Sequence, residues 1–157
     1  MLPQVLSEIE GSPVASYLRG SRWGYASISA LHILGIAALI GSVIPLNLKL
    51  LGAWPATQLA ALARVLVPVA ACGLTLAVFA GALLFSVRAH EYAALGVFQI
   101  KLLCVVLGTL SALRFHWRFG LAFDGAADIE RRIQAILSLG CWLGALVCGR
   151  LIAFAGF

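Results

Sequence analysis

His32 lies inside a long apolar run, in the segment SALHILGI. An ionisable side chain in such a run is costly when the run spans a bilayer, so it tends to face the protein interior and to serve a function. An imidazole can ligate haem iron or another metal, and it can form a hydrogen bond to a quinone headgroup. The alternative is a histidine that is only hydrogen-bonded within the core. His32 is therefore the first candidate for a functional group.

Two cations are predicted to lie at a similar depth, because a helix rises about 1.5 Å per residue. On this count His32 lies roughly 13 Å, Arg150 roughly 10 Å and Lys101 about 6–8 Å from the same membrane surface. The three residues would form one layer with excess positive charge. A haem propionate, a quinone carbonyl, an inorganic anion or a lipid phosphate would offset that charge. Alternatively, Lys101 and Arg150 extend to the interface along their apolar stems.

The two other histidines are less well placed for chemistry. Haem b in a helical bundle is usually held by imidazoles from facing helices. His90 is the candidate second ligand because it lies on the same side as His32, although their depths differ by about 10 Å or more. His116, in the segment RFHWR, is typical of a basic and aromatic interface girdle. The sequence contains no P-loop, zinc-protease or serine-hydrolase motif.

The composition predicts what must position these residues. The 157 residues are 62% hydrophobic and 11% charged, whereas soluble domains have about 25% charged residues. Four apolar runs are long enough to span a bilayer, at residues 23–51, 57–87, 97–119 and 133–157. We predict an all-α polytopic membrane protein, with a four-helix transmembrane domain at residues 21–157. Asp128 is the expected N-cap of the fourth helix.

Residues 1–20 precede this domain and have apolar side chains spaced three to four residues apart. This spacing predicts a short amphipathic helix on the membrane surface, interrupted at Ser12-Pro13. The alternative is a frayed terminus.

Basic residues predict the orientation of the chain. An even number of spans places both termini on one side, where Arg19, Arg22 and Arg88 lie. The opposite side has six basic residues: Lys49, Arg64, Arg114, Arg118, Arg131 and Arg132. The positive-inside rule then predicts that both termini are periplasmic or extracellular. The net charge of +5 follows from this topology, and no nucleic-acid partner is expected.

Small residues and cysteines inside the runs have mainly packing roles. The four cysteines lie in apolar runs without a C-x-x-C pair, as expected for buried apolar residues. Gly140 and Gly144 form a G-x-x-x-G pair, which favours close helix contact within the chain or in a homo-oligomer.

Several short segments together resemble a known family: HILG at residues 32–35, NLKLLG at 47–52, FQIK at 98–101, SLGCWLG at 138–144 and GRLIA at 149–153. Over nearly its whole length the chain resembles a family of small bacterial four-helix integral membrane proteins of unknown function. That family has an acid and an arginine where this chain has Asn47 and Lys49. Because of this departure, an ion pair of the family at these positions does not carry over to this chain. More loosely, the chain is similar to four-helix b-type cytochromes and copper-resistance membrane proteins, a likeness of architecture alone.

The leading hypothesis is a redox-associated membrane subunit that binds haem b or quinone. His32 would be the axial ligand or the hydrogen-bond partner of the quinone, and His90 the second ligand. Lys101 and Arg150 would neutralise propionates or polarise carbonyls, and a membrane or periplasmic redox subunit would be the partner. A second hypothesis is a non-catalytic anchor or assembly partner that binds lipid or another subunit. A third, a small permease or metal-handling protein, is disfavoured because no acidic residue lies in the middle of a run.

Overall fold

The computed structural model describes residues 2–121, 123 and 125–154, and its regular elements over these residues are all helices. They are α1 (Leu2–Glu10), α2 (Pro13–Gly20), α3 (Arg22–Leu50), α4 (Leu59–Val87), α5 (Ala89–Ala94), α6 (Gly96–Phe119) and α7 (Asp128–Ile152). Four of them, α3, α4, α6 and α7, have 24 to 29 residues and are apolar enough to cross a membrane. The predicted all-α bundle is therefore confirmed, and the chain is a multi-pass membrane protein.

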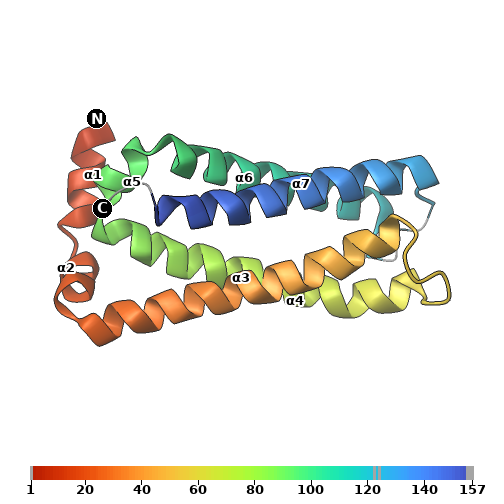
Figure 1. Cartoon of the computed structure of the whole chain (residues 1–157), viewed down its shortest axis with the longest axis horizontal. Helices are drawn as coiled ribbons and strands as arrows, with labels where there is room; N and C mark the ends of the chain where they lie inside the picture. The colour runs from red at the N-terminus through yellow and green to blue at the C-terminus, as the bar shows by residue number, and fades with distance from the viewer. Residues whose placement is uncertain (1, 122, 124, 155–157) are drawn as a thin grey trace.

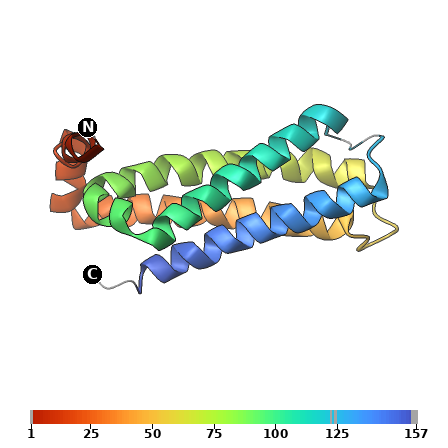
Figure 2. The ribbon, with the colours of Figure 1, turned by 90° about the horizontal axis from the view of Figure 1, so that it is seen from above.

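The four long helices form two hairpins that run along the long axis of the molecule (Figure 1). α3 packs closely on α4 and α6 packs on α7, while α3 and α7 join the two hairpins. In the described part of the chain, no backbone contact joins α4 to α6. The short helices α1, α2 and α5 lie at the same end as the last turns of α7 (Figures 1 and 2). We call this the terminal end, and we call the opposite end, with the connections 51–58 and 120–127, the loop end.

Two glycines determine how closely α3 approaches α4. A Cβ atom on Gly35 would lie 2.6 Å from the backbone nitrogen of Ala77 and 2.8 Å from the carbonyl oxygen of Gly73. A Cβ atom on Gly73 would lie 2.6 Å from the backbone nitrogen of Leu39. Small residues that let two backbones approach are a usual basis for helix packing in lipid. Any larger side chain at either glycine would separate the two helices.

The contact between α6 and α7 is looser. Gly108 faces Trp142, and Gly144 faces the Sγ atom of Cys104, which a Cβ atom on the glycine would meet at 3.3 Å. Gly140 is exposed, and a Cβ atom there would meet nothing within 4 Å. The two members of the G-x-x-x-G pair thus differ inside the chain, and a homo-oligomer through Gly140 and Gly144 stays a prediction.

Buried polar groups tie the hairpins together toward the loop end. The Nδ2 atom of Asn47 donates to the carbonyl oxygen of Val43 at 2.8 Å and to the Oγ atom of Ser138 at 3.0 Å. Both amide hydrogens are thereby satisfied, as a buried amide requires. Lys49 donates to the carbonyl oxygen of Trp54 at 2.7 Å and so closes the connection after α3.

The sequence predictions miss the start of the fourth long helix and the short helix α5. The fourth long helix begins at Asp128, not near Ile133, and its N-cap is Ala127, so the assignment of Asp128 as N-cap was wrong. The Glu130 carboxylate accepts from the backbone nitrogen of Ala127 at 3.0 Å. This bond stabilises a polar first turn that precedes the apolar run. The predicted final residues 155–157 lie outside the described residues, and α5 was not predicted.

The N-terminal segment folds as two helices that meet at the predicted break. The Ser12 hydroxyl accepts from the backbone nitrogen of Ala15 at 3.2 Å, and Pro13 occupies the first helical position. These are favoured residues for the start of a helix. α1 packs against α5, and α2 packs against α3 and α4. The segment is thus docked on the terminal end of the bundle.

Candidate functional site

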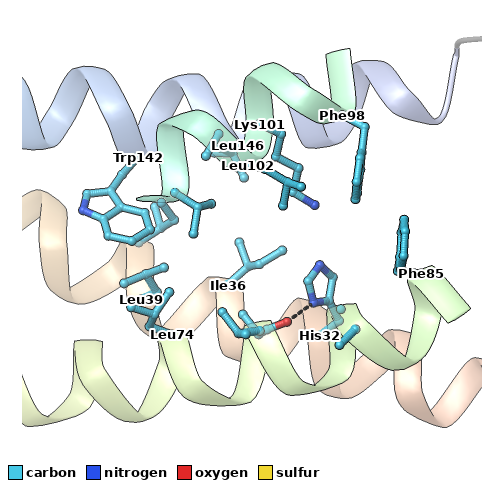
Figure 3. Close-up of a pocket in the computed structure, with 17 residues that line it drawn as sticks. His32, Ile36, Leu39, Leu74, Phe85, Phe98, Lys101, Leu102, Trp142 and Leu146 are labelled. Carbon is cyan, nitrogen blue, oxygen red and sulfur yellow. Dashed lines mark hydrogen bonds between the residues drawn. The ribbon is translucent and has the colours of Figure 1, made fainter. Parts of the chain in front are cut away.

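A cavity of about 310 Å³ lies between the two hairpins, in the half of the bundle near the terminal end (Figure 3). We call it the His32 cavity. Its lining is apolar apart from His32, Lys101 and the indole nitrogen of Trp142. Ligand sites typically have volumes of about 300–1,000 Å³ and combine an apolar lining with a few placed polar groups. The His32 cavity has this composition.

The backbone of α4 holds the His32 ring in one orientation. The Nδ1 atom of His32 lies 2.7 Å from the carbonyl oxygen of Ala77. A carbonyl oxygen only accepts hydrogen bonds, so Nδ1 must carry a proton. In the neutral imidazole, Nε2 is then an acceptor with a free lone pair, and Figure 3 shows this nitrogen pointing into the cavity. His32 therefore presents a hydrogen-bond acceptor or a metal ligand to the cavity.

Gly81 on α4 makes room for this ring. A Cβ atom on Gly81 would lie 2.9 Å from the Cε1 atom of His32 and 3.3 Å from its Nδ1 atom. The nearest atoms belong to a side chain that can rotate, not to backbone. Gly81 therefore shapes the site more than it determines helix packing.

We expect Gly81→Ala to move the His32 ring while the bundle stays folded. The added methyl group pushes Cε1 away and weakens the bond to the Ala77 carbonyl, so ligand affinity at the cavity falls about tenfold, as for the loss of one good hydrogen bond. Binding and thermal unfolding of the purified variant check this. A normal affinity with a large loss of stability would contradict it.

Lys101 enters the cavity from α6, on the opposite hairpin. Its Nζ atom and the free ring nitrogen of His32 point toward the same space (Figure 3). Its stem passes Gly149, where a Cβ atom would lie 3.7 Å from Cε. No carboxylate of a described residue lies within ion-pair distance of its ammonium group. The cavity thus contains one cationic donor and one neutral acceptor that face each other.

Arg150 does not belong to this site. Its side chain is exposed and its guanidinium carbon lies 4.9 Å from the ring centre of Phe154. The neighbouring Gly149 faces Lys101, and each helical residue is rotated by about 100° from the one before it. Arg150 therefore points away from the cavity, although it reaches a similar depth. The predicted layer of three polar groups reduces to a pair.

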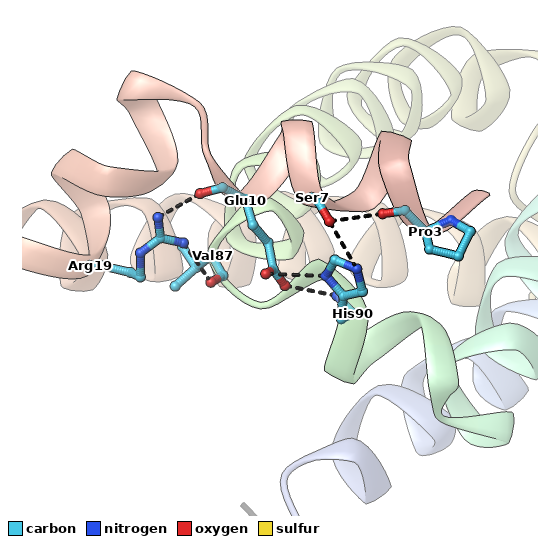
Figure 4. Close-up of polar contacts among 6 residues, drawn as sticks. All are labelled: Pro3, Ser7, Glu10, Arg19, Val87 and His90. Carbon is cyan, nitrogen blue, oxygen red and sulfur yellow. Dashed lines mark hydrogen bonds and ion pairs between the residues drawn. The ribbon is translucent and has the colours of Figure 1, made fainter. Parts of the chain in front are cut away.

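His90 lies on α5, outside the cavity, and contacts the N-terminal helix (Figure 4). Its backbone nitrogen donates to Oε1 of Glu10 at 2.8 Å, and its Nδ1 atom lies 3.2 Å from Oε2 of Glu10. Its Nε2 atom lies 3.5 Å from the Ser7 hydroxyl. These contacts dock α1 on α5. The structure does not bring His90 and His32 together.

The Glu10 contact predicts an acid-sensitive α1. The hydrogen bond from the His90 backbone, and then the one from its ring, lower the pKa of Glu10 from the ordinary value of 4.5. A lowered carboxyl pKa adds stability above that ordinary value and loses it as pH falls through the folded value. We therefore expect hydrogen exchange in residues 2–10 to speed up below about pH 4.5 relative to intrinsic rates. Glu10→Gln should speed it up at pH 7, whereas the exposed control Glu8→Gln should not; equal exchange in both variants would contradict this prediction.

Aromatic rings border the cavity, and the sequence analysis did not identify them as part of a site. The rings of Phe85 and Phe98 stack with centroids 5.3 Å apart and planes 8° apart. Both line the cavity, and Trp142 lines its other end (Figure 3). The only signal in the sequence was aromatic residues in apolar runs, which is also typical of ordinary core packing.

The cavity reaches the outer surface beside the Phe85–Phe98 stack, where the backbones of α4 and α6 stay apart. Val78 of α4 and Leu102 of α6 both line it, yet they are 55% and 47% exposed. In a membrane such exposed apolar side chains face lipid. An apolar ligand can therefore enter sideways from the bilayer without crossing an aqueous loop.

A second cavity of about 160 Å³ lies toward the loop end, and we call it the His116 cavity. It shares Leu39, Leu74 and Trp142 with the His32 cavity. The Nδ1 atom of His116 is buried and has no hydrogen-bond partner among the described residues. The interface-girdle interpretation therefore missed that this ring faces inward, edge-on to Phe123.

The chain matches no protein-family model, no characterised protein and no solved structure. Among the residues that the structure describes, no three His, Cys, Asp or Glu side chains come together as a metal site.

Proposed function

We propose that this chain is a membrane subunit of a redox system and that its His32 cavity binds a quinol headgroup. One observation carries the proposal: an acceptor nitrogen of His32 and a cationic donor of Lys101 face the same space in an apolar cavity. An aromatic hydroxyl complements this pair, because it donates through its hydrogen and accepts through its oxygen. The apolar lining and the aromatic rings then surround the ring of the headgroup.

The lateral opening supports the same ligand class. A quinol carries an apolar tail and dissolves in the bilayer, so it would reach the cavity between Val78 and Leu102. The tail would remain among lipid chains. The headgroup would form hydrogen bonds to His32 and Lys101 in place of its bonds to water. A soluble polar ligand would have no such route, because the lining is almost entirely apolar.

The geometry also predicts a preference between redox states. A quinone carbonyl can accept from Lys101, but it cannot donate to the free lone pair of His32. A quinol makes both bonds and would bind more tightly. In this arrangement Nε2 of His32 would accept the proton of the bonded hydroxyl when a redox partner in the membrane or periplasm takes one electron from the bound quinol.

Thermal unfolding of the purified protein with three matched ligands tests the proposal. A decyl-substituted benzoquinol should raise the unfolding temperature, because a ligand that binds only the folded state stabilises it. Its dimethyl ether has the same ring and tail without hydroxyl hydrogens and should give little increase, and the quinone should lie between them. Equal increases with the quinol and the ether would show simple filling of an apolar cavity and would contradict the proposal.

Haem b is the second candidate because of the same His32 geometry. A ring whose Nδ1–H is bonded to a carbonyl presents Nε2 as iron ligands usually do. His32 is the only histidine that lines this cavity, and His90 contacts Glu10 instead, so a second axial histidine would have to come from elsewhere. Oxidised and dithionite-reduced absorption spectra of protein purified from native membranes decide this, since a protein without a Soret band contains no haem.

We further propose the location and relatives that the sequence suggests. The chain would lie in a bacterial inner membrane with its termini outside, which places the His32 cavity in the outer leaflet. It would belong with the small bacterial four-helix membrane proteins that it resembles. A non-catalytic anchor would bind lipid or a partner subunit instead and would not need quinol, so the quinol titration separates the two functions.

A further inference from the structure

A third pocket, separate from the His32 and His116 cavities, opens at the terminal end, where four helices meet. We call it the arginine pocket. It has a volume of about 630 Å³ and is lined by Leu18, Arg19, Arg22, Tyr25, Val87, Arg88 and Tyr92. Three of these seven residues carry guanidinium groups, and none is acidic. This composition is that of an anion site, since guanidinium groups bind carboxylate and phosphate oxygens through paired hydrogen bonds.

Hydrogen bonds to backbone groups hold the Arg19 side chain in place. Its Nη1 atom donates to the carbonyl oxygen of Val87 at 3.1 Å, and its Nη2 atom donates to the carbonyl oxygen of Glu10 (Figure 4). Both acceptors are neutral backbone groups. Nη2 also donates to the Ser16 hydroxyl at 3.3 Å, and the Glu10 carboxylate nearby offsets part of the charge. A guanidinium group has five N–H donors, so Arg19 keeps two of them for an anion. The side chain is preorganised for that role, which lowers the entropic cost of binding.

Arg22 supplies a second charge at the start of α3. It is exposed, and it forms no ion pair with a carboxylate of a described residue. Arg88 adds a third guanidinium group, which is bonded to Glu91 at 3.3 Å on the exposed side of α5. The pocket therefore retains a net positive charge.

Tyrosine hydroxyls complete the polar lining. Burial, followed by the charge and hydrogen bond of Tyr25, raises the pKa of the Tyr92 hydroxyl. A tyrosine hydroxyl is protonated at neutral pH even without this shift, so Tyr25 and Tyr92 add neutral polar groups to the lining. A site with guanidinium groups and neutral hydroxyl donors favours an oxyanion over a cation or an apolar group.

The depth of the pocket identifies the source of the oxyanion. It lies at the ends of α3 and α4, beside the surface helix α2. Neighbouring Tyr17 and Trp23 are 65% and 82% exposed, as expected for aromatic residues at headgroup level. The anion present in this layer is the phosphate of a phospholipid. We propose that the arginine pocket binds the phosphate of an anionic phospholipid and so attaches the terminal end to the membrane surface.

Arg22→Gln tests this proposal because the residue is exposed and its removal leaves the Arg19 contacts in place. Arg132→Gln is the matched control, an exposed arginine near the loop end. Purified proteins are compared by native mass spectrometry and thermal unfolding in phosphatidylcholine, with and without phosphatidylglycerol, and with inorganic phosphate as a third arm. We expect Arg22→Gln to weaken retention of phosphatidylglycerol about fivefold, the effect of one basic residue near an anionic surface, and the control to retain it.

Three outcomes would overturn the proposal. Equal retention by Arg22→Gln and the wild type would show that the pocket is not the site. An equal loss in Arg132→Gln would show that overall charge, not the pocket, attracts the lipid. Stabilisation by inorganic phosphate as large as that by phosphatidylglycerol would show that the ligand is a soluble phosphate.

Discussion

His32→Ala is expected to lower the affinity for a short-tailed quinol about tenfold while the protein stays folded. The variant removes the acceptor at Nε2 and leaves Lys101 as the one polar contact to the hydroxyl group. A hydrogen bond in a site that excludes water contributes about 1–1.5 kcal/mol, and about 1.4 kcal/mol is a factor of ten. Affinity is measured by equilibrium dialysis of the quinol against purified protein under anaerobic conditions.

His90→Ala is the matched control for this variant. His90 contacts Glu10 and Ser7 on α1 and does not line the cavity. We expect it to loosen α1 and leave quinol affinity within twofold of the wild type. A large loss of affinity in His90→Ala, with little loss in His32→Ala, would assign the ligand to the terminal end and contradict the site.

Gly35→Ala is expected to cause the largest loss of stability of any single methyl group added to α3. The new Cβ atom would overlap the backbone of Ala77 and Gly73 at 2.6 and 2.8 Å. Neither backbone can rotate away, so α3 and α4 must separate. Overpacking of this kind costs about 1–3 kcal/mol, which lowers the unfolding temperature by roughly 2–12 °C for a chain of this size.

Gly41→Ala on the same helix separates this effect from helix propensity. A Cβ atom on Gly41 would meet nothing within 4 Å. Alanine favours a helix over glycine by about 0.5–1 kcal/mol, so this variant should be neutral or slightly more stable. Equal destabilisation by both substitutions would mean that the approach of α3 to α4 does not depend on Gly35. Gly35→Ala should also weaken quinol binding, because the Ala77 carbonyl that orients His32 lies at this contact.

The composition and spacing of the sequence predicted the architecture well. Long apolar runs can satisfy their backbone groups in lipid only as helices or closed barrels, and four runs of helical length gave four spans. The residue at which α7 begins was harder to predict. At Asp128 a polar segment continues the helix because Glu130 caps it, and hydropathy does not report such local bonds.

Depth along a helix is predictable from sequence, but direction around the axis is not when the whole circumference is apolar. Lys101 and Arg150 were assigned to one layer on equal grounds, yet one points into the cavity and the other lies over Phe154. His116 shows the same problem in reverse, since a residue assigned to the interface has a buried ring nitrogen. The role of Gly81 could not be predicted, because it depends on the packing of α3 against α4.

Photoaffinity labelling with an azido-quinone tests most directly whether the His32 cavity is the quinol site. After illumination and digestion, mass spectrometry identifies the labelled residues, and a parallel sample contains excess unlabelled quinol. We predict labels on inward-facing cavity residues of both hairpins, such as Ile36, Leu39 and Trp142, which the excess quinol removes and which His32→Ala lacks. Labels confined to lipid-facing residues such as Phe79 and Leu103, unaffected by excess quinol, would contradict it.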